Sequence, residues 1–195
     1  MKKLNYIFIA FSLLSIASCT SNDTLNNLVT ESDLVGEWSV YSLHTGQGSA
    51  NAYANGQSIS GSFNAYASNI SLTTFFEGPP NVFKAQGSLT ANSNISILGQ
   101  NFNEVIDINN VSNLIAPADW SLLDNRISFT NQNEIILADI IYFSTDTLRL
   151  KTAFNRNLID YSGTDIIQQI DSISNNIISL DSLRVTADIY LTLIR

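Results

Sequence analysis

The 195-residue chain has little charge, one cysteine, one histidine and three prolines. A single Cys and a single His cannot build a Cys/His zinc site or a disulfide framework. Charged residues make up 13% of the chain, about half the usual share, and acidic residues outnumber basic ones by 17 to 9. Proteins that bind nucleic acid by neutralising its phosphate backbone carry an excess of basic residues, whereas the net charge here is −8. The sequence therefore predicts no binding of nucleic acid through its backbone.

The polar character of the chain comes instead from uncharged side chains. Asn, Ser and Thr number 23, 25 and 14, and Ile alone numbers 24. β-Branched and aromatic residues favour strands, and hydroxyl and amide side chains suit the outer faces of a half-buried sheet. The composition therefore predicts an all-β protein, and the length suits one domain with its own core.

The N-terminal segment has the pattern of a signal peptide. Two lysines precede residues 6–16, which are mostly apolar but too few to span a bilayer as a helix. The segment ends in Ile-Ala-Ser-Cys at residues 16–19, which resembles a bacterial lipobox. The resemblance implies removal of residues 1–18 and attachment of lipid, palmitate included, to Cys19. The alternative is an ordinary signal peptide cleaved near Ser18, with Cys19 incidental.

Cleavage before Cys19 would leave 7 basic and 17 acidic side chains, a net charge of −10. Anionic head groups repel such a chain, so the lipid would be its attachment to the membrane. We expect a protein of the cell envelope, an outer-membrane lipoprotein that faces either the periplasm or the surface. Residues 19–33 are polar and without strong periodicity, which predicts a flexible tether. Within them, Thr24 lies in an Asp-Thr-Leu sequence similar to an O-glycosylation signal of some Gram-negative bacteria.

Alternating apolar residues between turn signals predict a series of antiparallel strands in the rest of the chain. An Asn-Gly pair at residues 55–56 predicts a tight hairpin. The apolar parity changes within residues 57–76, which predicts a bulge near Ser68 and Asn69. The other expected strands are residues 36–43, 49–54, 82–90, 95–98, 120–123, 126–130, 134–143, 147–154 and 183–195.

Two segments leave the secondary structure open. Residues 101–116 fit a strand with a loop or with a short helix. Residues 164–180 have isoleucines at helical spacing, but their β-branched content favours a strand, so one short helix before the last strand is only slightly preferred. Eight to ten antiparallel strands with short connections close most naturally into an up-and-down β-barrel.

Leu34-Val35-Gly36-Glu37-Trp38 opens the expected domain, residues 34–195, and its Gly-x-Trp resembles the lipocalin signature. The resemblance implies a barrel in which Trp38 packs across the closed end, beneath an Arg from a late strand. Arg195 has the parity of the apolar face of residues 183–195, where a charge needs a partner, and the Trp38 ring would supply one.

A second stretch supports the same resemblance. Residues 118–122, Ala-Asp-Trp-Ser-Leu, look like the middle of lipocalin-like lipoproteins of Gram-negative bacteria. Residues 49–62 depart from the lipocalin pattern because they are rich in Ala, Gly and Ser, so we expect that hairpin to be an appendage.

The barrel hypothesis leaves three functions open. A cavity would favour non-catalytic binding of a small apolar molecule, with expected contacts to Leu148, Leu150, Phe154, Val185 and Ile189. A solid core would favour an accessory or interaction protein without a small ligand. A glycan-acting enzyme would need clustered carboxylates. His44 is expected at a strand end, beside a loop at Thr45 and Gly46, and no nucleophile motif supports it, so we expect no catalytic residue, no metal and no cofactor.

Overall fold

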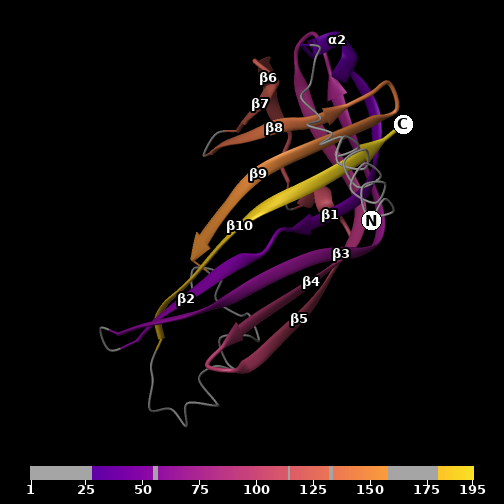
Figure 1. The fold of residues 1–195 in the computed structure, drawn as a ribbon. Helices are drawn as coiled ribbons and strands as arrows, with labels where there is room; N and C mark the ends of the chain where they lie inside the picture. Colours follow the sequence, from indigo (N-terminus) through magenta and orange to yellow (C-terminus); the bar gives the residue numbers. More distant parts are fainter. Residues whose placement is uncertain (1–27, 55–56, 114, 132–133, 158–179) are drawn as a thin grey trace, which may run out of the picture.

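The computed structural model describes residues 28–54, 57–113, 115–131, 134–157 and 180–195. The predicted all-β antiparallel barrel is confirmed: ten antiparallel strands form one sheet, and eight of them close into a ring (Figure 1). The elements are α2 (Glu31–Leu34), β1 (Gly36–Thr45), β2 (Gly48–Ala54), β3 (Gln57–Glu77), β4 (Val82–Ile97), β5 (Gln100–Ile108), the 3₁₀ turn η1 (Val111–Asn113), β6 (Ala118–Leu123), β7 (Arg126–Thr130), β8 (Ile135–Phe143), β9 (Thr147–Asn157) and β10 (Leu180–Ile194).

The ring runs β1-β3-β4-β6-β7-β8-β9-β10 and returns to β1. Most neighbours in it are joined over five or more residue pairs, but β4 and β6 pair only at Val82↔Asp119 and Phe83↔Ala118. The ring is therefore closed most weakly at this junction.

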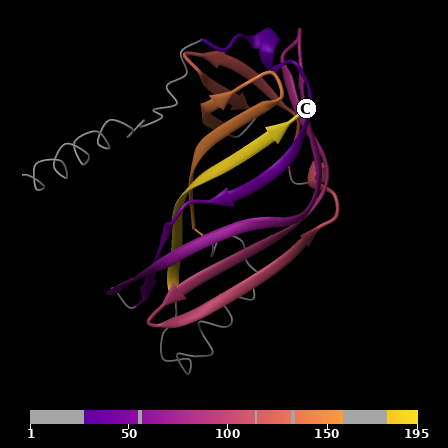
Figure 2. The ribbon, with the colours of Figure 1, turned by 45° about the vertical axis from the view of Figure 1, so that its right-hand side comes forward.

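Two strands lie outside the ring and extend it (Figures 1 and 2). After a break at residues 46–47, β2 continues in the direction of β1 and pairs with the far halves of β3 and β10. The strand β5 pairs with the far half of β4. The hairpin of residues 49–62, expected to be an appendage, thus shares a sheet with the C-terminal strand.

The predicted bulge is present in β3. The register of β3 against β4 shifts between Ser68 and Ser71, and Asn69 has a positive φ of 49°, which Asn tolerates better than most residues. The shift keeps apolar residues on the inner face on both sides of the bulge.

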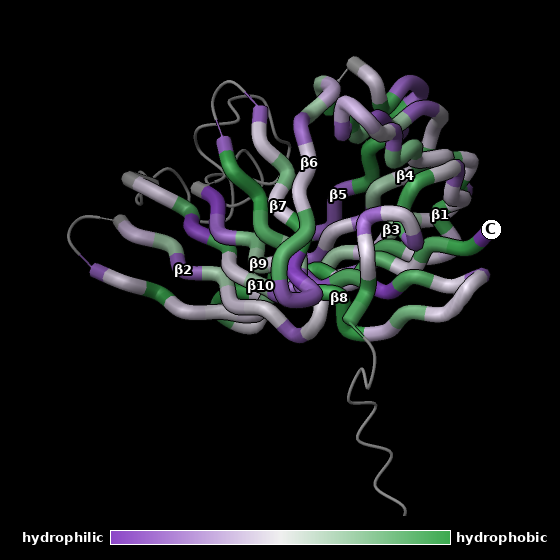
Figure 3. The backbone as a smooth tube through the Cα atoms, turned by 90° about the horizontal axis from the view of Figure 1, so that it is seen from above, coloured by the Kyte–Doolittle hydropathy of each residue, from purple (hydrophilic) through white to green (hydrophobic). Residues whose placement is uncertain are grey.

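Inward-facing residues form two apolar clusters. The larger lies inside the ring and includes Trp38, Phe76, Trp120 and Leu148. The smaller lies in the extension and includes Phe63, Ile95 and Val185. Seen from above, hydrophobic and hydrophilic stretches alternate along the strands, as expected when one face of each strand is buried (Figure 3).

The domain begins before residue 34, where the sequence placed its boundary. Glu31–Leu34 form the short helix α2, and Val29 and Leu34 are buried in the larger cluster. The Asp33 carboxylate accepts hydrogen bonds from the backbone N–H and the hydroxyl of Thr30, at 2.9 and 2.7 Å. Residues 28–33 therefore belong to the folded domain and not to the expected tether.

Of the two segments whose secondary structure the sequence left open, the structure describes most of the first. Residues 101–116 contain most of strand β5 and, after it, the 3₁₀ turn η1. The segment is therefore a strand followed by a short helical turn. Residues 158–179, which include most of the expected short helix, lie outside the described residues, as do Cys19 and Thr24. Within the described ranges, no helix has the length and apolar character needed to cross a membrane.

Candidate apolar binding cavity

Trp38, Leu34 and Val29 are buried at the end of the ring where β1 begins and β10 ends, which we call the sealed end. The Trp38 side chain is completely buried, and its indole N–H donates a hydrogen bond to the Leu34 carbonyl at 2.8 Å. The guanidinium carbon of Arg195 lies 3.9 Å from the centroid of the Trp38 ring. The Arg195 Nη2 donates to the carbonyl oxygens of residues 33, 34 and 35, at 3.0, 3.2 and 2.9 Å. The contact expected from the strand parity is therefore present.

Gly36 lets Arg195 approach the chain. Its φ of +135° is disfavoured for residues with a side chain, and a Cβ there would lie 3.3 Å from the Arg195 Nη2. Two features therefore favour glycine at this position of the Gly-x-Trp sequence: the positive φ and the close approach of Arg195.

The interior of the ring contains a cavity of about 290 Å³, which we call the barrel cavity. It is lined almost entirely by apolar side chains from β1, β3, β4, β6, β7, β8, β9 and β10 and from the segment before β6. The lining residues are Val40, Leu43, Leu72, Thr74, Phe83, Ala85, Ile115, Ala116, Ala118, Phe129, Asn131, Ile136, Ala138, Leu150, Thr152, Ile189, Leu191 and Leu193.

The hydroxyl protons in this wall already have acceptors. The Thr74 hydroxyl donates to the Trp38 carbonyl at 3.3 Å, and the Thr152 hydroxyl donates to the Leu137 carbonyl at 2.7 Å. No charged side chain lines the barrel cavity within the described part of the chain. Such a wall favours a ligand that needs no hydrogen bond deep inside.

The barrel cavity reaches the surface on one side. Ile115 and Ile136 line it but are 45% and 41% exposed. Ala116 and Asn131 line it too and are exposed. These four residues form a mouth with two large apolar side chains and one amide.

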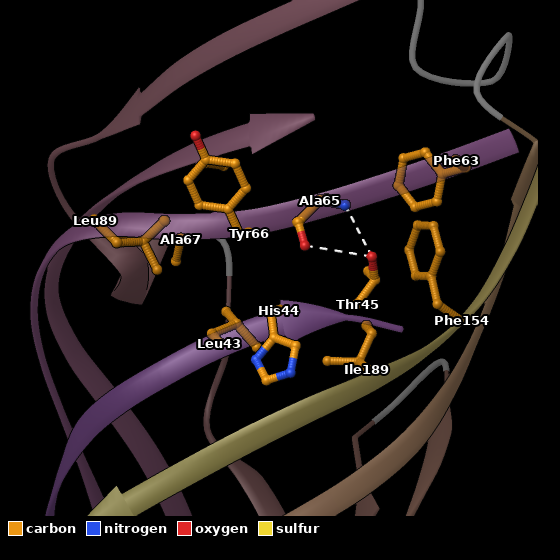
Figure 4. A pocket seen from close by; sticks show the side chains of 11 residues that line it. Leu43, His44, Thr45, Phe63, Ala65, Tyr66, Ala67, Leu89, Phe154 and Ile189 are labelled. Atoms are coloured by element: carbon orange, nitrogen blue, oxygen red, sulfur yellow. Dashed lines mark hydrogen bonds between the residues drawn. The ribbon is translucent and has the colours of Figure 1, made fainter. Parts of the chain in front are cut away.

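A second apolar cavity of about 160 Å³, which we call the lower cavity, lies toward the extension (Figure 4). The rings of Phe63 and Phe154 stack beside it, with centroids 6.2 Å apart. The Thr45 hydroxyl donates to the Ala65 carbonyl at 3.3 Å and accepts from the Ala65 N–H at 2.8 Å, so its bonding capacity is used within the wall. The other lining residues are Leu43, His44, Tyr66, Ala67, Leu89, Ala91 and Ile189.

The five residues expected to contact a ligand fall into two groups. Leu150 lines the barrel cavity, Phe154 lines the lower cavity, and Ile189 lines both. Leu148 and Val185 are fully buried in the two apolar clusters and line neither cavity. The parity of β9 and β10 identified the inward face of each strand, but parity does not tell which inward residues border an empty volume.

Sequence reasoning missed the cavity residues of the other strands. Val40, Leu72, Phe83 and Phe129 all lie on the inward parity of predicted strands, so the signal that identified Leu150 was present for them too. Ile115 and Ala116 lie in a connection and had no such signal.

Neither the histidine nor any of the carboxylates that an enzyme would need lines the barrel cavity in the described structure. His44 lies near the end of strand β1, as expected, and its ring stacks on that of Tyr190 with the centroids 5.5 Å apart. The Asp107 carboxylate accepts a hydrogen bond from Thr90, and Asp124 lies in the tight turn between β6 and β7. Among the described residues, no three His, Cys, Asp or Glu side chains form a group that could hold a metal ion.

Comparison with known proteins adds little to this geometry. No protein-family profile matches the chain, and no curated protein matches it. A solved structure that resembles it is a polyisoprenoid-binding domain from Saccharophagus degradans implicated in plant cell wall breakdown. The match covers 80% of this chain and 97% of that chain, with 9% identity and a TM-score of 0.31. Similarity at this level carries no argument about family or ligand.

Proposed function

We propose that the protein is a lipid-anchored, lipocalin-like protein of the cell envelope that binds a small apolar molecule and releases it chemically unchanged. The observation that carries this proposal is the barrel cavity, about 290 Å³ of space bounded by apolar side chains. An eight-stranded barrel can instead be filled by its own side chains, which would have favoured the accessory-protein alternative.

The size of the barrel cavity limits the ligand. Ligand pockets range from about 300 to 1,000 Å³, so this cavity is near the lower end of the range and suits a small or slender molecule. Micromolar affinity corresponds to about 8 kcal/mol. At about 25 cal/mol per Å², burial of roughly 350 Å² of apolar surface would supply that free energy before the costs of association.

The chemistry of the wall supports binding without turnover. A reaction needs a group that donates or accepts a proton or that attacks the bound molecule. The polar side chains in the wall are two threonines with engaged hydroxyl protons and Asn131 at the mouth. Such a wall excludes water from an apolar ligand and orients it only by shape.

The lipocalin-like family and the anchor are parts of the same proposal. The Gly36, Trp38 and Arg195 contacts at the sealed end support the lipocalin-like relationship. The Ile-Ala-Ser-Cys sequence supports lipid attachment at Cys19, which would hold the barrel at the outer membrane. A membrane-attached carrier would meet apolar molecules where they are concentrated.

Native mass spectrometry of the delipidated full-length protein with a lipid extract tests the proposal. We expect one apolar molecule to bind per chain. Ala138→Leu places a larger side chain in the barrel cavity and should weaken binding at least tenfold, because Ala138 lines that cavity and is 3% exposed. Ala153→Leu is the matched control, since Ala153 is exposed on β9 next to the cavity-lining Thr152. Absence of any bound apolar molecule would favour the accessory-protein alternative.

A further inference from the structure

Two side chains border both the barrel cavity and the lower cavity. Leu43 and Ile189 line both. They come from adjacent strands at neighbouring positions, since Leu43 pairs with Leu191 and Thr45 pairs with Ile189 in the ladder between β1 and β10. The two volumes therefore lie on either side of a partition made of two aliphatic side chains.

Such a partition can move more easily than a wall of backbone. Leu43 and Ile189 are both partly exposed, and neither belongs to the fully buried part of the core. Aliphatic side chains change rotamer at low cost when an empty volume lies next to them, and each of these two has a cavity on both sides. A slender molecule could pass between them, whereas a bulky fused-ring molecule could not.

The lower cavity suits the apolar end of such a molecule. Three alanines, Ala65, Ala67 and Ala91, leave its wall open, and the Phe63 and Phe154 rings stack beside it. The Thr45 hydroxyl is already bonded to Ala65, and the other two polar side chains that line the cavity, His44 and Tyr66, are exposed (Figure 4). A polar group placed among these alanine and phenylalanine side chains would gain no hydrogen-bond partner from them.

The mouth of the barrel cavity offers the opposite chemistry. Asn131 lines it there together with the exposed Ile115 and Ile136, and the Asn131 Oδ1 accepts a hydrogen bond from the Glu134 N–H at 3.0 Å. The mouth is therefore polar mainly because it is open to water. A molecule with one polar end and one long apolar chain would keep its polar end at this mouth and near water.

We propose that the ligand is a single unbranched apolar chain with one polar end, and that it occupies both cavities at once. Its polar end lies at the mouth near Asn131, and its tail passes between Leu43 and Ile189 into the lower cavity. The lower cavity then sets the preferred chain length. This inference rests on the proposed function, because it assigns the shape of the ligand for the same barrel.

Chain-length dependence makes the inference measurable. Each further methylene buried raises affinity about fourfold. If the tail enters the lower cavity, affinity continues to rise after the barrel cavity is filled. If it does not, affinity levels off once the barrel cavity is full.

The experiment compares octanol and hexadecanol binding to the full-length protein by isothermal titration calorimetry. Ala91→Leu fills the lower cavity, Ala138→Leu fills the barrel cavity, and Ala153→Leu changes an exposed site outside both. We expect Ala91→Leu to weaken hexadecanol binding at least about tenfold more than octanol binding. Ala138→Leu should weaken both alcohols alike, and Ala153→Leu should change neither. Thermal melting of each variant shows whether it remains folded.

The outcomes separate the inference from the proposal on which it rests. Equal effects of Ala91→Leu on the two alcohols would overturn the two-cavity ligand and leave apolar binding in the barrel intact. The same holds if wild type binds octanol and hexadecanol with equal affinity. If wild type binds neither alcohol and no apolar molecule from a lipid extract, both the proposed function and this inference are wrong. If Ala91→Leu unfolds the protein, Ile189→Phe, which enlarges the partition itself, makes the same comparison.

Discussion

The guanidinium group of Arg195 covers the ring of Trp38 at 3.9 Å and also bonds to three carbonyl oxygens of the chain that leads into β1. One side chain thereby joins the end of β10 to the start of β1 and holds α2 above the sealed end. The Leu34 carbonyl accepts bonds from both side chains, from the Trp38 indole and from Arg195. Removal of either side chain therefore takes a hydrogen-bond donor from at least one of these carbonyl oxygens.

We expect Arg195→Ala to lower the free energy of unfolding by about 1–3 kcal/mol, through lost stacking and through carbonyls left without a donor. Arg195→Lys should recover only part of this, because an ammonium group cannot both lie flat on the ring and serve three carbonyls. Urea denaturation measures both values. A lysine variant as stable as wild type would show that charge alone matters here.

Gly36→Ala tests the approach of Arg195 to the backbone. The substitution places a Cβ at φ +135° and 3.3 Å from the Arg195 Nη2. We expect a loss of about 1–3 kcal/mol from backbone strain and displacement of the guanidinium group. Gly99→Ala is the matched control, because Gly99 also has a positive φ, +74°, but nothing lies within 4 Å of its Cβ position. Equal losses in the two variants would mean that backbone strain accounts for the whole effect.

Asp33 should make stability depend on pH in the acidic range. Hydrogen bonds from the hydroxyl and the backbone N–H of Thr30 hold the pKa of Asp33 below its ordinary value of 3.8. A carboxyl group with a lowered folded-state pKa stabilises the fold above its unfolded pKa, and this contribution is lost as the pH falls through the folded-state pKa. Because solvent screens this group, we expect no more than about 1 kcal/mol.

The measurement is urea denaturation of wild type and Asp33→Asn from neutral pH to about pH 3. The difference in unfolding free energy should be constant near neutral pH and should shrink below about pH 4. Glu37→Gln removes a charge from an exposed position on β1 and serves as the control. A difference that grows with acidity would contradict the assigned role of Asp33.

The strands were predictable from sequence because local alternation reports which face is buried. The parity change in β3 even located the bulge at Asn69. The strand β4 was predicted as two strands because residues 91–94 are small and polar. In the structure the side-chain amide of Asn92 donates a hydrogen bond to the Ser68 hydroxyl, and that of Asn94 donates to the side-chain oxygen of Asn103. These bonds join β4 to its neighbours, so the polar residues continue the strand instead of ending it.

The remaining features depend on contacts that local patterns do not encode. The continuation of β1 by β2 is defined by their shared partners β3 and β10, which lie far apart in sequence. The cavities depend on how closely inward side chains from eight strands approach one another. Leu148 and Leu150 lie on the same face of β9, yet Leu148 is fully buried in the core and only Leu150 lines the barrel cavity. The helix α2 did have a signal, because Thr30 and Asp33 have the spacing of a capping box.

Attachment at Cys19 is the last prediction, and it can be tested without the barrel. Each buried methylene of an acyl chain contributes about 0.8 kcal/mol, and several chains are needed for stable anchoring. A chain cleaved before Cys19 would carry 17 acidic and 7 basic side chains, so electrostatic attraction to an anionic bilayer would not replace lost lipid. Cys19→Ser should therefore move the protein from the membrane to the soluble fraction and abolish labelling by radioactive palmitate. Ser18→Ala keeps the small residue that the lipobox pattern requires and should stay labelled and membrane-bound. Wild-type protein that takes up no label, or that a high-salt wash releases, would instead support the ordinary signal peptide with Cys19 incidental.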